Sequence, residues 1–112
     1  MTEEERKIRI RDVTDVLELI GNRWRGPILS YLCESPRRFS ELKDTLGSIT
    51  PRILIKELRY LEMNKMVYSE KSTIAGNSVV YGLTEHGESI EPVIVAIHNW
   101  AKEHRKLILN KE

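Results

Sequence analysis

The segment from Arg38 to Leu83 constrains the fold most, because it holds two short helix patterns followed by two strand patterns. Its clearest signal is Thr50-Pro51, where a capping hydroxyl precedes a proline at the first position of a helix. Leucines then recur at spacings of four and three, which predicts one buried face: Leu54, Leu58 and Leu61. An earlier short helix should end near Leu46, only a few residues before this start. Two helices this close together predict a helix-turn-helix.

A β-hairpin is predicted after the helix pair. Strand patterns over residues 66–71 and 79–83 flank Gly76-Asn77, and both of these residues tolerate the positive φ of a tight turn. Helical spacing also occurs over residues 13–20 and 28–32, and again in a long pattern after Thr84. The predicted fold class is therefore α+β, mostly α: a winged helix-turn-helix in which the hairpin is the wing.

The last helix pattern carries a wide apolar stripe that includes Ile90, Ile94, Ile97 and Trp100. A chain of 112 residues has little surface with which to cover such a stripe, and exposed apolar patches usually mark interfaces. We therefore expect a homodimer whose interface is formed by the N- and C-terminal helices. The alternative is that the stripe completes the core of a monomer. The predicted organisation is a single domain over residues 1–112, with an N-terminal arm at 1–11 and a dimerisation helix at 85–110.

The net charge of the whole chain is only +1, but its basic residues are unevenly distributed. Between Ser35 and Ser78 there are eight basic and five acidic residues, so the remainder of the chain is net acidic. Phosphate binding depends on a local cationic face more than on a high total charge. A solvated surface with no partner is the alternative explanation of this asymmetry.

The sequence contains no pattern typical of catalysis or of a metal site. It has no glycine-rich phosphate loop, no nucleophile beside a base and no Cys/His cluster, so we expect no enzyme, no cofactor and no metal. The single cysteine, Cys33, is expected to be a small buried thiol, because it lies among apolar residues. A redox switch would need an exposed thiol with a lowered pKa. No apolar run approaches the roughly 18 residues of a membrane helix, and residues 1–12 lack the apolar core of a signal peptide, which predicts a cytoplasmic protein with no membrane partner.

The order and spacing of several motifs resemble the HxlR family of bacterial winged-helix transcriptional regulators. These motifs are LELIGNRW at 17–24, RFSELK at 38–43, the pattern from Ile49 to Glu62, VVYGLTEHG at 79–87, and the pattern from Glu91 to Trp100. The resemblance implies a homodimeric repressor or activator whose second motif helix enters the DNA major groove, with the wing on the backbone or minor groove. Family members commonly carry a cysteine at the position of Arg11, so thiol sensing is not expected here. The usual proline-rich wing is replaced by residues 74–78.

Candidate DNA contacts lie on the open side of the second motif helix, on the wing and near the start of the helix over 28–32. They are Thr50, Pro51, Arg52, Ile55, Lys56 and Arg59 on the helix, Lys71, Thr73, Asn77 and Ser78 on the wing, and Arg23 and Arg25. Arg52 is expected to reach base edges, because it lies in the first turn of the helix. Ile55 is predicted to pack either on a thymine methyl group or against the wing.

These residues predict a sequence-specific transcriptional regulator, with repression favoured over activation, that binds double-stranded DNA as a homodimer on an inverted repeat. The alternative is a winged-helix module that binds protein, since the fold alone does not decide function. That alternative gains if acidic residues such as Glu57 and Glu70 interrupt the positive surface. No residue supports a small-molecule effector, although a cavity between the first, second and last helices could hold one.

Overall fold

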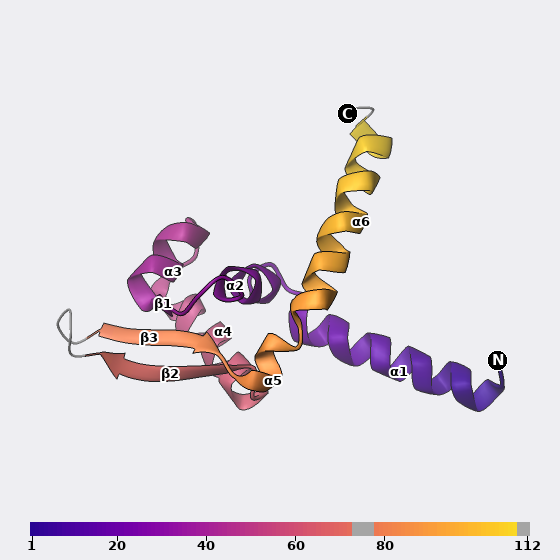
Figure 1. Ribbon diagram of the computed structural model, residues 1–112, viewed down its shortest axis with the longest axis horizontal. Helices are drawn as coiled ribbons and strands as arrows, with labels where there is room; N and C mark the ends of the chain where they lie inside the picture. The colour runs from indigo at the N-terminus through magenta and orange to yellow at the C-terminus, as the bar shows by residue number, and fades with distance from the viewer. Residues whose placement is uncertain (73–77, 110–112) are drawn as a thin grey trace.

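The computed structural model describes residues 1–72 and 78–109, and it consists mostly of helices with one small antiparallel sheet (Figure 1). In chain order the described elements are α1 (Glu3–Ile20), α2 (Arg25–Leu32), β1 (Arg37–Arg38), α3 (Phe39–Leu46), α4 (Pro51–Met63), β2 (Val67–Ser72), β3 (Ser78–Leu83), α5 (Glu85–Glu88) and α6 (Glu91–Leu109). The strand order is β1-β3-β2, and both strand pairs are antiparallel. The predicted winged helix-turn-helix is confirmed.

The hydrophobic core lies where α2, α3 and α4 meet the base of the sheet. Its fully buried side chains come from all three helices and from the turn before α4: Ile28, Leu29, Leu42, Ile49, Leu54, Leu58 and Leu61. The three leucines of α4 therefore face inward, as their spacing predicts. Burial of one such side chain contributes about 1.5–3 kcal/mol, so these leucines hold α4 firmly against the body.

The wing is the hairpin of β2 and β3, in which Val67 pairs with Leu83 and Ser72 pairs with Ser78. The short strand β1, which was not predicted, pairs with β3 through Arg37 and Tyr81. Two charged residues give no alternating pattern, so sequence carries little signal for this strand. The long C-terminal helix pattern also divides in two, because Thr84 caps the short α5 and α6 begins only at Glu91.

Both terminal helices project from the body (Figure 1). The predicted N-terminal arm over residues 1–11 is helical instead, because α1 begins at Glu3. A capping box explains this early start: the Thr2 hydroxyl accepts the Glu5 N–H at 3.1 Å, and the Glu5 carboxylate accepts the Thr2 N–H at 2.8 Å. Neither α1 nor α6 has a buried residue. The radius of gyration is 16.5 Å, whereas a compact chain of this length has about 13 Å.

Candidate nucleic-acid interface

A side-chain cap and a glycine turn fix the start of α4 at the surface. The Thr50 hydroxyl accepts the N–H of Ile53 at 3.2 Å, and Pro51 is the first helical residue. In the preceding turn Gly47 has a φ of +66° and a ψ of −93°, a conformation that residues with a Cβ rarely adopt. Thr50, Pro51 and Arg52 are all exposed. The first turn of α4 is therefore available to a partner, as the sequence predicts.

Three cations, Arg52, Lys56 and Arg59, form what we call the cationic face of α4. All three are exposed and lie opposite the buried leucines. Over the residues that the structure describes, none of them forms an ion pair. The two acids that could have paired with Arg59 are engaged elsewhere: Glu57 binds Arg25, and Glu62 accepts the Ser69 hydroxyl at 3.0 Å. The positive charge of this face is therefore free for an external anion.

Arg23 lies beside the start of α4. Its guanidinium donates to the Ser48 hydroxyl at 3.4 Å, and Ser48 belongs to the turn between α3 and α4. The same guanidinium lies 4.8 Å from the centre of the Trp24 ring. Arg23 is exposed, so it extends the positive surface past the N-terminus of α4. Sequence reasoning did not identify Ser48, which has no distinguishing pattern.

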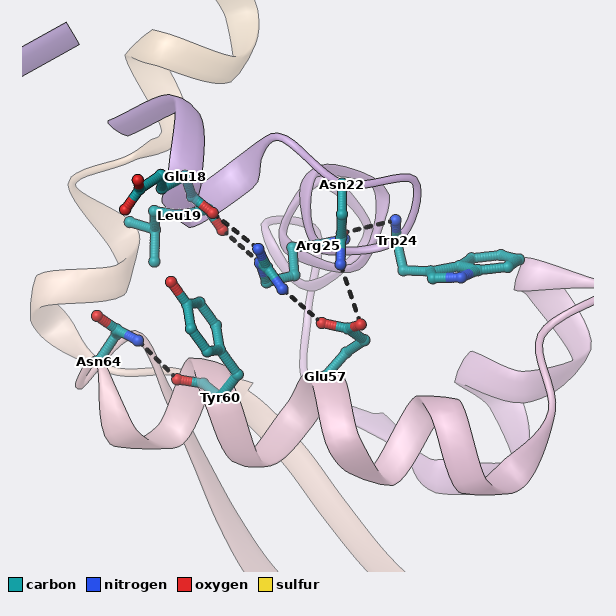
Figure 2. A network of polar contacts seen from close by, with 8 residues as sticks. All are labelled: Glu18, Leu19, Asn22, Trp24, Arg25, Glu57, Tyr60 and Asn64. Carbon is teal, nitrogen blue, oxygen red and sulfur yellow. Dashed lines mark hydrogen bonds and ion pairs between the residues drawn. The ribbon is translucent and has the colours of Figure 1, made fainter. Parts of the chain in front are cut away.

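Arg25 is placed differently from the prediction that it clamps the DNA backbone. Figure 2 shows its guanidinium turned inward between α1 and α4. It donates to the carbonyl oxygens of Glu18 and Leu19 and pairs with Glu57 at 2.7 Å. Only 16% of its side chain is exposed. Three of its five N–H donors are engaged inside the protein, so Arg25 contributes much less to the cationic surface than the exposed cations of α4.

Ile55 borders a hollow of about 390 Å³ between the helix pair and the wing. The hollow is lined by Phe39, Ser40, Ile55, Ser78, Val79 and Tyr81. Ile55 remains 37% exposed, so the wing covers only part of it. The two predictions for Ile55, packing against the wing and packing on a thymine methyl group, are therefore compatible. One side of the side chain lies toward the wing, and the other is exposed.

The wing contributes one exposed cation to the described surface. Lys71 is exposed on β2 opposite Val79, and Ser78 is half-buried at the start of β3. Glu70 precedes Lys71 directly, and successive side chains of a strand point to opposite faces, so the two charges lie on different faces of the hairpin. The predicted contacts Thr73 and Asn77 lie outside the described residues.

Cys33 is a half-buried thiol at the end of α2, not the fully buried one that the sequence predicts. Burial, and to a lesser degree the charge of Glu91, raises the pKa of this thiol. A raised pKa disfavours the reactive thiolate, so these surroundings do not suit a redox switch.

Two other kinds of site were sought over residues 1–72 and 78–109. No group of three or more His, Cys, Asp or Glu side chains in these ranges could hold a metal ion. No helix in them is both long enough and apolar enough to cross a membrane.

Comparison with known proteins identifies a family that matches most of this chain. The sequence model described as HxlR-like helix-turn-helix matches residues 19–108. The uncharacterized HTH-type transcriptional regulator YdeP of Bacillus subtilis is 33% identical over 96 residues, which cover 86% of this chain and 75% of YdeP. The HTH-type transcriptional regulator YodB of the same organism is 33% identical over 85 residues, 76% of each chain.

Solved structures agree with this assignment. The reduced form of the redox regulator HypR superimposes with a TM-score of 0.81 at 30% identity, covering 88% of this chain and 98% of HypR. Reduced YodB from B. subtilis gives a TM-score of 0.74 at 30% identity, over 82% of this chain and 90% of that one. These proteins are transcriptional regulators and not enzymes, and the predicted function class is confirmed at this level. This chain is a transcriptional regulator with a helix-turn-helix domain, and it belongs to the HxlR-like helix-turn-helix family.

Proposed function

We propose that this regulator is a sequence-specific repressor that binds double-stranded DNA as a homodimer on an inverted repeat. The observation that carries this proposal is the cationic face of α4. Arg52, Lys56 and Arg59 are exposed and unpaired over the described residues, while the opposite face of the same helix is buried. An α-helix with such a face fits the major groove, and its charges match the phosphates on either side.

Each candidate residue has a distinct role in this proposal. Arg52, in the first turn of α4, reads base edges, and a bidentate contact with guanine gives about 1–3 kcal/mol of discrimination. Lys56, Arg59 and Arg23 bind phosphates, and Thr50 and Pro51 bring the helix N-terminus close to the backbone. The proposed backbone contacts of the wing are Lys71, Thr73, Asn77 and Ser78.

The dimer is proposed because most of α1 and α6 extends beyond the few residues, Leu19, Ile20 and Ile94, that pack against the core. The two helices contain 18 and 19 residues, and none of these is buried. In proteins most of the stability of a helix comes from tertiary packing of its apolar side and not from intrinsic propensity. Large apolar side chains are exposed along both helices: Ile10, Val13 and Leu17 on α1, and Ile97, Trp100 and Ile108 on α6. A second copy of the chain supplies complementary helices, and a two-fold axis matches the same patch to itself.

A two-fold dimer presents two copies of α4 to the DNA. Paired reading helices of this kind address half-sites about 10 base pairs apart, and two-fold symmetry makes the operator an inverted repeat. A protein bound across a promoter in this way excludes polymerase, which is the basis for proposing repression. We place this activity in the cytoplasm, together with the DNA that the proposed regulator binds.

The alternative, a module that binds protein in place of DNA, is less well supported by the charges. Glu57 is 5% exposed and engaged with Arg25, so it does not interrupt the cationic face of α4. Glu70 lies on the other face of the hairpin from Lys71. The acids that would have broken up the positive surface are therefore directed away from it.

The proposal is tested by selecting duplexes from a random DNA pool and measuring binding by fluorescence anisotropy across a salt series. Wild-type protein should prefer the selected duplex over random DNA, with affinity falling steeply as salt rises. Arg52→Ala should reduce that preference by a factor of about 5 to 150, equivalent to the energy of a lost bidentate contact. The matched control is Lys65→Ala, which removes an exposed cation beyond the opposite end of α4.

Weak binding to all sequences alike, unchanged by Arg52→Ala, would support the protein-binding module. The dimer is tested separately by sedimentation velocity at micromolar concentration. We expect the wild-type protein to be a dimer and Ile97→Glu to dissociate it. Ile97 is 48% exposed on α6, so the substitution would place a charge in the proposed interface. A monomeric wild-type protein would refute the dimer.

A further inference from the structure

The end of α1, the start of α2 and the middle of α4 meet at one buried guanidinium (Figure 2). Arg25 donates from Nε to the Leu19 carbonyl oxygen at 2.8 Å and from Nη2 to the Glu18 carbonyl oxygen at 2.7 Å. These two carbonyls belong to the last turn of α1, where backbone acceptors have no partner within the helix. From Nη1 the same side chain donates to Glu57 of α4 at 2.7 Å. One planar group therefore binds two helices at once.

The contacts around this guanidinium restrict its position from several sides. Its carbon atom lies 4.1 Å from the centre of the Tyr60 ring, also on α4. The second carboxylate oxygen of Glu57 accepts the Asn22 side-chain amide at 3.0 Å. Asn22 in turn accepts the backbone N–H groups of Trp24 and Arg25 at 2.9 and 2.8 Å. The link between α1 and α2 is thereby held to the same carboxylate as Arg25.

We propose that Arg25 and Glu57 are positioning residues that set the angle between α4 and α1. This inference rests on the proposed function, in which α1 contributes to the dimer interface and α4 reads DNA. Packing restrains α1 only at its end, since Leu19 and Ile20 are half-buried against the core and no residue of the helix is fully buried. Charged hydrogen bonds of this length and planarity are strong and directional, so they restrain the angle of the helix where packing does not.

A fixed angle matters because it determines the spacing between the two reading helices of a dimer. Helix α4 has 13 residues and is about 20 Å long. The Arg25 contact lies at Glu57, the midpoint of α4, so a rotation of about 20° about this point would move each end by about 3.5 Å, which is roughly one base-pair step. Loss of the Arg25 contacts should therefore relax the half-site spacing that the dimer accepts, without changing the residues that touch each half-site.

The geometry can be measured without DNA by double electron–electron resonance on the full-length protein. A nitroxide label at Thr45→Cys, in a Cys33→Ser background, reports from an exposed position on α3 in each protomer. The parent protein should give one narrow inter-protomer distance. Arg25→Met should broaden or shift that distance while the dipolar modulation depth is retained. Arg25→Lys should do so to a lesser extent, because a single ammonium does not replace the planar fork.

Two further variants keep the measurement decisive. The double variant Arg25→Met/Glu57→Leu removes both buried charges together, so it should stay folded and still show the altered distance. Arg37→Met is the matched control. The guanidinium carbon of Arg37 also lies 4.1 Å from the centre of a tyrosine ring, that of Tyr31, and Arg37 pairs with Glu34. These contacts join α2 to β1 and do not involve α1 or α4. The distance distribution of this control should equal that of the parent.

The DNA readout follows with the duplex that wild-type protein selects. Adding or removing one base pair between the half-sites should weaken wild-type binding strongly, and this spacing preference should flatten in the double variant. Affinity for a single half-site should stay the same. An unchanged distance distribution in Arg25→Met and in the double variant would overturn the positioning role. A spacing preference retained by the double variant would also overturn the positioning role. Absence of dipolar modulation in the parent would instead refute the proposed dimer.

Discussion

Removing the Arg25 side chain should destabilise the protein far more than removing an ordinary surface arginine. The Arg25–Glu57 pair is nearly enclosed, with 16% and 7% of the two side chains exposed. In Arg25→Met the Glu57 carboxylate keeps only the Asn22 amide among the partners described above. Breaking a buried pair in this way costs about 3–5 kcal/mol, because the remaining charge is neither solvated nor neutralised. The partial exposure of Arg25 admits some water, so we expect about 3 kcal/mol.

Removing the partner carboxylate, in Glu57→Leu, should destabilise the protein less than Arg25→Met does. In Glu57→Leu the guanidinium keeps its two carbonyl acceptors on α1 and its stacking on Tyr60. The loss of one charged hydrogen bond amounts to about 1.5–3 kcal/mol. Replacing both residues, as in Arg25→Met/Glu57→Leu, removes both buried charges and fills the space with apolar atoms. Such replacements are often neutral, so the double variant should lie within about 1 kcal/mol of wild type.

Urea unfolding of wild type, Arg25→Met, Glu57→Leu and the double variant gives the four free energies of a double-mutant cycle. The protomer concentration must be the same in each experiment, because the stability of a dimer depends on that concentration. The singles and the double together should give a coupling energy of several kcal/mol between Arg25 and Glu57. The control cycle on Arg37 and Glu34, where Glu34 is 69% exposed, should give less than about 1 kcal/mol. A destabilisation below about 1 kcal/mol in Arg25→Met, or additive effects in the double variant, would refute this reasoning.

Three other predictions concern the helix cap, the reading face and the thiol. Thr50→Ala should lower the free energy of unfolding by about 1 kcal/mol through loss of the cap on α4, whereas Thr50→Ser should keep it; equal urea midpoints for the two variants would contradict this. Ile55 should contact thymine methyl groups. Replacing thymidine by deoxyuridine in the selected duplex should weaken wild-type binding by up to about fourfold, which corresponds to one buried methyl group. Ile55→Ser should bind the thymidine and deoxyuridine duplexes equally. Because burial raises the pKa of Cys33, less of it is thiolate at pH 8 than in a free thiol. Its alkylation by iodoacetamide, followed by mass spectrometry, should therefore be slower than that of a Thr45→Cys thiol in a Cys33→Ser background and should accelerate at higher pH.

The part of the fold with strong local signals was predictable from sequence. Thr50-Pro51 and the leucine spacing place the start and the buried face of α4 correctly, because capping and helical periodicity act within a few residues. The same periodicity leaves Arg52, Lys56 and Arg59 on the open side, where the structure has them. Each of these properties depends on one helix and its immediate neighbours.

Properties that depend on tertiary approach were not predictable in this way. Arg25 and Arg23 both stand near the start of α2, and no local pattern distinguishes the one that turns inward from the one that stays exposed. What separates them is the position of Glu57, 32 residues further along the chain. The helical state of residues 3–11 is different, because it does have a local signal: the Thr2–Glu5 capping box marks the start of α1 and contradicts the predicted arm over residues 1–11.

Helix α4 combines three functions because its side chains divide among three directions at about 100° per residue. The leucines face the core, Glu57 and Tyr60 face Arg25 and the end of α1, and the cations face outward. A rotation of α4 about its own axis would misplace all three sets together. The buried leucines resist such rotation, and the Arg25 contacts resist tilting relative to α1. The cationic face is therefore held in register with α1 by contacts made on the other two faces. In the proposed dimer, substitutions at Glu57 should alter DNA spacing and those at Arg52 should alter base preference.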